Sequence, residues 1–146
     1  MLAYIDGSCV GNPGEAACGI VLKNEDGTIL EQNGFYLGHG TNNVAEYEGL
    51  LHCLESARRY NAEILTVHSD SQLLVNQVNG RFRVKQQHLM ELHKRVMESI
   101  GRGKLRFKIQ YIPREENRGA DRLARDAIRI HSHSSRTGSN SRGQGG

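Results

Sequence analysis

The sequence predicts an α/β fold in which a five-stranded mixed sheet is flanked by helices. Three apolar runs near the N-terminus are separated by turn residues, which indicates three antiparallel strands in a meander. The pattern then changes to amphipathic helices that alternate with short strands, which adds parallel strands to the same sheet. The chain of 146 residues has the length of about one domain.

The meander is expected to contain strands at residues 2–5, 17–22 and 29–37. Gly11-Asn12-Pro13-Gly14 marks the first turn, and Asp26-Gly27 marks the second. Because aspartate and glycine tolerate positive φ angles, Asp26-Gly27 predicts a tight hairpin turn of the primed type.

Periodicity predicts the remaining elements. Apolar side chains three and four residues apart predict helices, and alternation of apolar with basic residues predicts the last strand. We expect helices at 43–60, 72–78, 89–100 and 117–130, and strands at 64–68 and 105–111. These elements form one domain over residues 1–130. Residues 131–146 are polar and basic with almost no apolar side chain, so we predict a disordered C-terminal tail.

Composition excludes several classes of protein. No apolar run approaches the roughly 20 residues of a membrane-spanning helix. The N-terminus lacks the charged start and apolar stretch of a secretory signal, so we expect a cytoplasmic protein. The cysteines Cys9, Cys18 and Cys53 are odd in number and without Cys-x-x-Cys spacing, which favours free thiols over disulfides or a zinc site.

Acidic and basic residues are segregated along the chain. Residues 1–80 contain ten acids and three bases, and residues 81–108 contain nine bases and two acids. Such a division suits a polyanion held near a carboxylate metal site, because phosphates attract cations and hard metals prefer carboxylates. A solvated helix face and a polar edge strand would produce the same pattern.

Four acids lie where this topology brings chain segments together. Asp6 is on the first strand, Asp70 ends the fourth strand, and Glu46 and Asp121 begin helices. Glu46 could form a capping box with Asn43, Asp121 could stabilise the helix dipole, and Asp70 could be a turn or cap residue. Asp6 is harder to explain structurally, because a carboxylate inside an apolar strand is costly without a metal or a cation.

Each of these acids lies in a distinctive segment of the chain. The four segments are Asp6-Gly7-Ser8-Cys9-Val10-Gly11-Asn12-Pro13-Gly14, Thr41-Asn42-Asn43-Val44-Ala45-Glu46-Tyr47, Ser69-Asp70-Ser71-Gln72 and Asn117-Arg118-Gly119-Ala120-Asp121-Arg122-Leu123-Ala124. They resemble, in the same order, the four signature segments of type I ribonucleases H. The resemblance covers roughly residues 1–130 and excludes the tail.

The resemblance implies a ribonuclease H-like fold and an endonuclease that hydrolyses the RNA strand of RNA–DNA hybrids. It implies that Asp6, Glu46, Asp70 and Asp121 hold two divalent ions. Mg²⁺ is expected because it prefers oxygen ligands, and Mn²⁺ could substitute. In such a site one ion activates water and the other stabilises the leaving 3′-oxygen, and the two ions lie roughly 3.5–4 Å apart. Cleavage would leave 5′-phosphate and 3′-hydroxyl ends.

Substrate contacts are also implied by the resemblance. Contacts to 2′-hydroxyl groups distinguish RNA from DNA, and the residues placed to make them are Cys9, Asn12, Asn42, Glu46 and Gln72. Thr41 and Asn42 are placed to bind a phosphate of the DNA strand. Ordinary turn and cap chemistry would equally explain Thr41, Asn42 and Asn12, and Cys9 could simply be small and buried.

The chain departs from many relatives in two places. The loop before Asp121 lacks a histidine and offers Arg114 or Glu115 instead. Arginine cannot act as a base at neutral pH, so Arg114 would bind a phosphate or the leaving product. A basic helix-loop handle is also absent, which leaves substrate affinity to Arg81, Arg83, Lys85 and basic positions downstream.

Three alternatives stay open. The domain could be a non-catalytic module that binds hybrids or double-stranded nucleic acid, although the intact set of four acids argues against it. It could be another nuclease or strand-transfer enzyme of the superfamily, although the residues that read 2′-hydroxyls argue against that. The compact form could also cut double-stranded RNA. The expected partner is an RNA–DNA hybrid, bound by a monomer.

Overall fold

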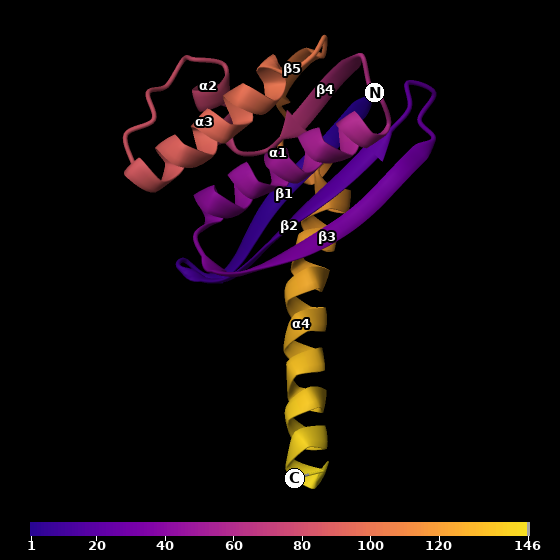
Figure 1. Cartoon of the computed structure of the whole chain (residues 1–146), viewed down its shortest axis with the longest axis vertical. Helices are drawn as coiled ribbons and strands as arrows, with labels where there is room; N and C mark the ends of the chain where they lie inside the picture. The colour runs from indigo at the N-terminus through magenta and orange to yellow at the C-terminus, as the bar shows by residue number, and fades with distance from the viewer. Residues whose placement is uncertain (146) are drawn as a thin grey trace.

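A five-stranded mixed sheet forms the centre of the molecule, as predicted. The computed structural model describes the backbone of residues 1–145 and the side chains of residues 1–134. The strands are β1 (Leu2–Gly11), β2 (Gly14–Lys23), β3 (Ile29–Gly40), β4 (Ile64–Ser69) and β5 (Arg106–Tyr111). Their order is β3-β2-β1-β4-β5 (Figure 1). β1, β2 and β3 are antiparallel, whereas β1, β4 and β5 run parallel.

Helices cover both faces of this sheet (Figure 1). One face packs against α1 (Asn42–Arg59), which contacts α2 (Gln72–Val78) and α3 (Gln87–Gly101). A short 3₁₀ turn, η1 (Arg114–Glu116), leads from β5 into α4 (Arg118–Gly145). α4 packs across β1, β2 and β3 on the opposite face, and its C-terminal part extends beyond the sheet (Figure 1).

The two faces are packed differently. Between the sheet and α1, large apolar side chains such as Ile5, Ile20, Tyr47 and Leu50 are fully buried. On the α4 side, small residues let the helix backbone approach the strands. A Cβ atom on Gly19 would lie 2.1 Å from the Ala120 carbonyl oxygen, which no side chain could occupy. Apolar burial on one face and close backbone contact on the other thus hold α1 and α4 in place.

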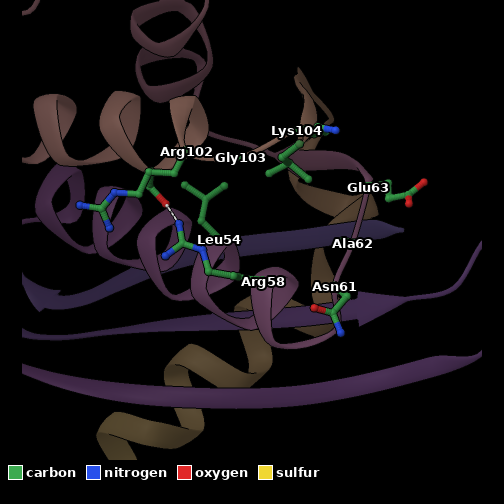
Figure 2. A pocket seen from close by; sticks show the side chains of 10 residues that line it. Leu54, Arg58, Asn61, Ala62, Glu63, Arg102, Gly103 and Lys104 are labelled. Carbon is green, nitrogen blue, oxygen red and sulfur yellow. Dashed lines mark hydrogen bonds between the residues drawn. The ribbon is translucent and has the colours of Figure 1, made fainter.

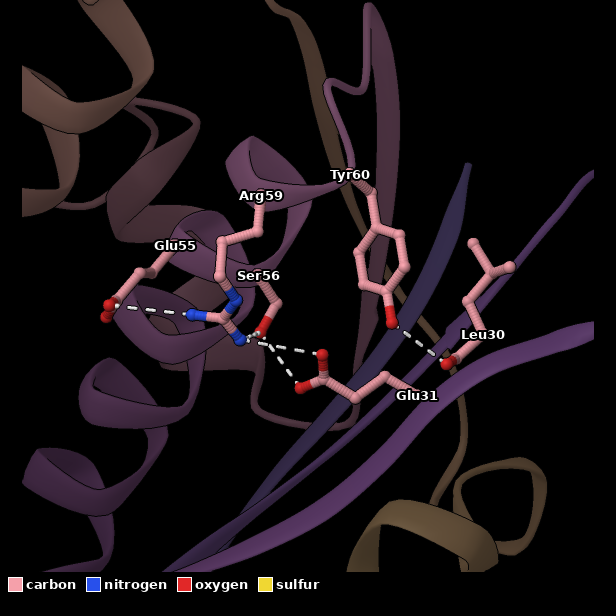
Figure 3. Close-up of polar contacts among 6 residues, drawn as sticks. All are labelled: Leu30, Glu31, Glu55, Ser56, Arg59 and Tyr60. Carbon is pink, nitrogen blue, oxygen red and sulfur yellow. Dashed lines mark hydrogen bonds and ion pairs between the residues drawn. The ribbon is translucent and has the colours of Figure 1, made fainter.

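Polar contacts tie the C-terminal half of α1 to β3 (Figure 3). The Ser56 hydroxyl donates to Glu31 Oε2 at 2.9 Å, and Arg59 forms an ion pair with Glu31 Oε1 at 3.5 Å. The Tyr60 hydroxyl donates to the Leu30 carbonyl at 3.0 Å. These bonds satisfy a partly buried carboxylate and fix the end of the helix.

The predicted hairpin between β2 and β3 is present, but its turn is not of the primed type. Gly27 has φ of +89°, whereas Asp26 does not adopt positive φ. The Gly27 N–H donates to the Asn24 carbonyl at 3.0 Å, and the Asn24 N–H donates to the Thr28 carbonyl at 2.9 Å. The Asp26 carboxylate accepts from the Thr28 N–H. A longer loop therefore needs only one residue with positive φ.

The first three strands are longer than predicted. β1 continues to Gly11, although its apolar pattern ends at Ile5 and Val10 is 66% exposed. Backbone pairing with β2 maintains the strand, since every residue from Leu2 to Gly11 has a partner there. Pairing along the hairpin therefore extends a strand beyond the residues whose side chains are buried.

The last helix continues past Ile130, where the sequence predicts a tail. The His131 ring stacks on Tyr36 at a centroid distance of 3.6 Å, and the Ser132 hydroxyl donates to Glu15 at 3.2 Å. These contacts correct the predicted boundary for residues 131–134. The side chains of residues 135–146 lie outside the described part of the chain, and the predicted tail there stays a prediction.

None of the helices in the described part of the chain is both long enough and apolar enough to span a membrane.

Candidate active site

An acidic cluster lies where β1 continues past the end of β4. β4 pairs with β1 only from Leu2 to Ile5, so Asp6 is the first β1 residue beyond this pairing. Asp70 directly follows β4, and Glu46 projects from the first half of α1. Carboxylate oxygens of Asp6, Glu46 and Asp70 all lie within 4.8 Å of one another. The topology thus brings together three of the four acids singled out in the sequence.

Local packing directs Glu46 into this cluster. Thr41 caps α1, because its hydroxyl accepts from the Val44 N–H at 3.2 Å. A Cβ atom on Gly7 would lie 2.6 Å from the Glu46 nitrogen, so only glycine lets the helix approach β1 this closely. Glu46 is buried and directed towards Asp6, and the capping-box interpretation of Glu46 is therefore wrong.

Asp70 is likewise not needed as a helix cap. Ser71 caps α2, with its hydroxyl accepting from the Leu74 N–H at 3.1 Å. The Ser71 N–H in turn donates to the Ser69 hydroxyl at 3.0 Å. The neighbouring serines complete the local turn, and the Asp70 carboxylate is left free to face the cluster.

Burial and mutual repulsion raise the pKa of two of these acids. Asp6 is 5% exposed and Glu46 is 7% exposed. Burial is the largest cause for Asp6, and the nearby charges of Glu46 and Asp70 raise its pKa further. Burial also raises the pKa of Glu46, although the Gly7 N–H bonds to it and opposes the shift. Without a cation, the folded protein therefore disfavours full ionisation of the cluster.

The cluster has the donor set of a site for hard divalent cations. Its ligand atoms are carboxylate oxygens, which Mg²⁺ and Mn²⁺ prefer. Glu46 Oε2 is buried and has no hydrogen-bond partner. An unpartnered buried carboxylate oxygen is costly unless something compensates its charge. A bound cation would supply that compensation, so the residues present fit a metal site.

Asp121 lies at the margin of the same cluster. It is in the first turn of α4 and is half-buried. Its carboxylate contributes, through a hydrogen bond and its charge, to the raised pKa of Asp6. Asp121 also forms an ion pair with Arg125 at 2.6 Å. The fourth acid therefore lies beside the other three but already has a cationic partner.

Asn117 is a site residue that was not among the predicted candidates. Its side chain is buried, and its Nδ2 donates to the Ile5 carbonyl at 2.8 Å and to Asp70 Oδ2 at 3.5 Å. Its Oδ1 has no hydrogen-bond partner. Asn117 thus links β1, Asp70 and the start of α4. Its place four residues before Asp121, in the fourth signature segment, is the signal that could have identified it.

The predicted substrate contacts lie in β1, in the β1–β2 turn and at the starts of α1 and α2. The Asn42 N–H donates to Asn12 Oδ1 at 3.1 Å, which joins the β1–β2 turn to the start of α1. The Cys9 thiol is half-buried and donates to the Gly40 carbonyl at 3.1 Å. Gln72 is exposed at the first position of α2. Cap and turn chemistry therefore accounts for Thr41 and Asn12, and their predicted role in substrate binding stays a prediction.

The predicted cations occupy two separate segments. Arg114 is exposed in η1, and its charge lowers the pKa of Glu46, which places it near the cluster. Arg81, Arg83 and Lys85 are exposed in the connection from α2 to α3. Gln77 Nε2 donates to the Arg83 carbonyl at 3.4 Å and anchors this connection to α2.

A separate cavity of about 510 Å³ lies away from these acids, between the ends of α1 and α3 and the start of β5 (Figure 2). Leu54 and Leu105 line it, with Arg58, Arg102 and Lys104 around them. Glu63, which also lines it, precedes β4, whereas Asp70 follows β4. This cavity therefore lies near the N-terminal end of β4, whereas the acidic cluster lies at its C-terminal end.

Comparison with known proteins identifies close relatives of the chain. A family model described as "Reverse transcriptase-like" matches residues 4–127. The ribonuclease HI of Halobacterium salinarum is 37% identical over 126 residues, covering 86% of this chain and 63% of that protein. A bifunctional protein of Mycobacterium tuberculosis is 39% identical over 124 residues, covering 84% of this chain and 34% of that protein.

Solved structures match at similar identity. The crystal structure of an RNase H1 in complex with RNA/DNA hybrid superposes with a TM-score of 0.85 at 34% identity, covering 89% of this chain and 97% of that one. The chain spans about a third of the length of the mycobacterial relative and about two thirds of the halobacterial one.

Proposed function

This chain belongs to the type I ribonuclease H family, and we propose that it is an endonuclease that hydrolyses the RNA strand of RNA–DNA hybrids. The observation that carries this proposal is the cluster of two buried acids, Asp6 and Glu46, with half-buried Asp70, whose carboxylate oxygens lie within 4.8 Å of one another. The similarity to an RNase H1 solved with RNA/DNA hybrid supports the choice of substrate.

Divalent cations would be held by Asp6, Glu46, Asp70 and Asp121. We expect two cations in the site when substrate is bound. We propose Mg²⁺ as the natural ion, with Mn²⁺ as a substitute, because the ligands are carboxylate oxygens. When bound, the ions supply charge that activates water for attack on phosphorus and stabilises the leaving oxygen. Products with 5′-phosphate and 3′-hydroxyl ends would follow.

Neighbouring residues would hold this cluster in position. Asn117 donates to both the Ile5 carbonyl and Asp70, so it fixes the carboxylate of Asp70 relative to β1. Arg125 restrains Asp121 through their ion pair. Arg114, exposed near Glu46, would attract the scissile phosphate or the departing product, since its charge is permanent.

Other predicted site residues would distinguish the RNA strand from the DNA strand and bind the hybrid duplex. Cys9, Asn12, Asn42 and Gln72 would contact 2′-hydroxyl groups of the RNA, and Thr41 with Asn42 a phosphate of the DNA. Arg81, Arg83 and Lys85 would bind phosphates farther along the hybrid. We further propose that the protein acts as a monomer in the cytoplasm.

Cleavage of a labelled RNA–DNA hybrid in Mg²⁺ tests the function, with RNA duplex, DNA duplex and single-stranded RNA as parallel substrates. Cutting should be confined to the RNA strand of the hybrid and abolished in Asp70→Asn. Cutting of the RNA duplex as well would broaden the substrate class. Tight hybrid binding without cutting in Mg²⁺ or Mn²⁺ would instead indicate a non-catalytic binding module.

Hybrid affinity measured against salt tests the basic segment separately. Binding should weaken steeply as salt rises, with a slope that reflects the number of phosphates neutralised by the protein. Neutralising Arg81, Arg83 and Lys85 with glutamine should reduce that slope by about 0.9 for each phosphate that the variant no longer binds. A slope that is flat in the unaltered protein would contradict this assignment.

A further inference from the structure

Four arginines form a stripe along the exposed side of α4. Arg118, Arg122, Arg125 and Arg129 are spaced by four, three and four residues, which places them on one face of an α-helix. All four are exposed, and the side chains of Arg122, Arg125 and Arg129 are 84%, 67% and 72% exposed. We call these four residues the arginine ridge.

Folding does not require this ridge. α4 packs against the sheet through its other side, where Ala120, Ala124 and Ile128 are buried. The guanidinium groups therefore cover no apolar core, and exposed ion pairs along a helix stabilise it only weakly. Any smaller polar residue would solvate this side of the helix equally well.

Acids along α4 neutralise the ridge only in part. Asp126 lies between Arg122, at 4.0 Å, and Arg129, at 3.5 Å, so two cations share one carboxylate. Arg125 forms an ion pair with Asp121. A bound metal would also interact with the Asp121 carboxylate and would weaken this ion pair. Among the described residues, Arg118 forms no ion pair within 4.0 Å. The ridge thus retains positive charge that could bind an anion.

The ridge begins at the acidic cluster and leads away from it. Four arginines line one surface hollow, namely Arg118, Arg122 and Arg125 of the ridge together with Arg114. Three acids line the same hollow, namely Glu115, Asp126 and Asp121, the last of which lies at the margin of the acidic cluster. From Arg118 to Arg129 the helix rises about 16 Å, at ~1.5 Å per residue. A polyanion that leaves the cluster on this side would meet a guanidinium group at each turn of α4.

We propose that the arginine ridge binds the backbone of a single-stranded RNA segment that continues from the hybrid past the catalytic centre. The inference rests on the proposed function, which puts the RNA strand beside Asp121. Guanidinium groups bind phosphate oxygens with two parallel hydrogen bonds, which suits a flexible strand. At the roughly 3.4 Å per nucleotide of one strand of duplex DNA, the ridge would span about five nucleotides, and it would span fewer of an extended single strand. Its residues offer cations and no aromatic platform, so binding would be independent of sequence.

The test compares a blunt RNA–DNA hybrid with the same hybrid carrying a single-stranded extension. Extensions of RNA at the 5′ end, RNA at the 3′ end and DNA at either end form the arms. Affinities are measured in Mg²⁺ across a salt series, in the Asp70→Asn background, which is expected to bind without cutting. The ridge variant carries two substitutions, Arg122→Gln and Arg129→Gln. It leaves Arg114, Asp121 and Arg125 unchanged.

The matched control carries Arg102→Gln and Lys104→Gln. It removes the same number of charges beside the separate cavity, at the opposite end of the strands from the acidic cluster (Figure 2). We expect one of the RNA extensions to tighten binding several-fold in the parent and in the control. The ridge variant should lack that advantage, and its slope of log affinity against log salt should fall by about 1.4 for two phosphates of a single strand.

Several outcomes would overturn the inference. They are an equal affinity for blunt and RNA-extended hybrids in the parent, an equal weakening in the control variant, and an equal gain from DNA extensions. Cleavage of the blunt hybrid by the otherwise unaltered protein reports on the proposed function separately, and the ridge variant should cut it at an unchanged rate. If the protein cuts no hybrid but still prefers hybrids with RNA extensions, the proposed function is wrong and the proposed role of the ridge is retained.

Discussion

Glu31 and the acidic cluster are both partly buried, but only the Glu31 carboxylate has its charge compensated by neighbouring side chains. Glu31, whose side chain is 16% exposed, accepts a hydrogen bond from Ser56 and forms an ion pair with Arg59 (Figure 3). Asp6 and Glu46 are at least as buried, but they face Asp70 and each other, and Glu46 Oε2 has no hydrogen-bond partner. The Glu31 carboxylate is satisfied by the protein, whereas the acidic cluster is left with a buried oxygen that has no hydrogen-bond partner.

The difference separates a structural from a functional use of buried charge. A carboxylate that is fully partnered contributes to a defined structure and has little reason to bind anything else. Carboxylates that repel one another in a buried position raise their own pKa values and disfavour the metal-free state. Such a site favours a divalent cation because the protein itself has left the charge uncompensated.

The largest expected effect is that of Asp6→Asn. Removing one cation ligand should lower the rate of hybrid cleavage on the order of 1,000-fold or more, since a bound metal supplies several kcal/mol to the transition state. The metal-free protein should become more stable to denaturant, because neutral asparagine removes the cost of burying an acid that must bind a proton in the folded state. Cleavage kinetics and chemical unfolding measure the two effects. A metal-free protein destabilised by the substitution would contradict the comparison.

The pH dependence of metal-free stability is the next largest effect. The pKa values of Asp6 and Glu46 are raised in the folded state, mainly by burial. The folded protein therefore binds more protons than the unfolded chain above about pH 4, where free carboxyls ionise. The free energy of unfolding should fall as pH rises from there, by on the order of a few kcal/mol by neutral pH.

Addition of Mg²⁺ should reverse this trend. Cation binding requires ionised carboxylates and releases protons, so the stabilisation by Mg²⁺ should increase with pH. Thermal unfolding in Mg²⁺ and in chelator, across a pH series, measures both slopes. Asp6→Asn provides the control, because it should flatten the slope in chelator. Identical slopes with and without Mg²⁺ would count against a metal site in the cluster.

Arg114→Ala should have a moderate effect that is confined to catalysis. Arg114 is exposed and its charge acts on Glu46 without contributing to the core, so stability should change little. We expect turnover to fall about tenfold, equivalent to ~1.4 kcal/mol, while the Mg²⁺ concentration for half-maximal activity changes less. Arg102→Ala, an exposed arginine at the opposite end of the sheet from the acidic cluster, is the matched control and should leave turnover unchanged. Unchanged turnover in Arg114→Ala would remove its proposed role.

Glu31→Gln should have the smallest effect and should alter stability alone. The substitution removes the ion pair with Arg59, which is itself 57% exposed, and weakens the bond from Ser56. We expect a decrease of about 1 kcal/mol in the free energy of unfolding, with an unchanged cleavage rate. Denaturant midpoints and hybrid cleavage provide the two measurements. A decrease in activity without a decrease in stability would contradict the purely structural role of Glu31.

Much of the fold was predictable because periodicity reports which side chains are buried. The helix predicted over 72–78 coincides with α2, and the positions of all five strands were anticipated. Burial does not report backbone pairing, so the extension of β1 to Gly11 was missed. The primed turn at Asp26-Gly27 was wrong because the turn residues are the same for a longer loop with a single positive φ angle.

Sequence by itself determined which four acids to consider and which family the chain resembles, because those residues and their order are local features of the chain. Tertiary structure decided which acids share a site. Only the end of β4, the close approach of α1 over Gly7 and the start of α4 bring their carboxylates together. It also revealed Asn117, whose contacts with Ile5 and Asp70 join residues 112 and 47 positions apart in the chain. Proximity between distant segments follows from packing, which no local pattern encodes.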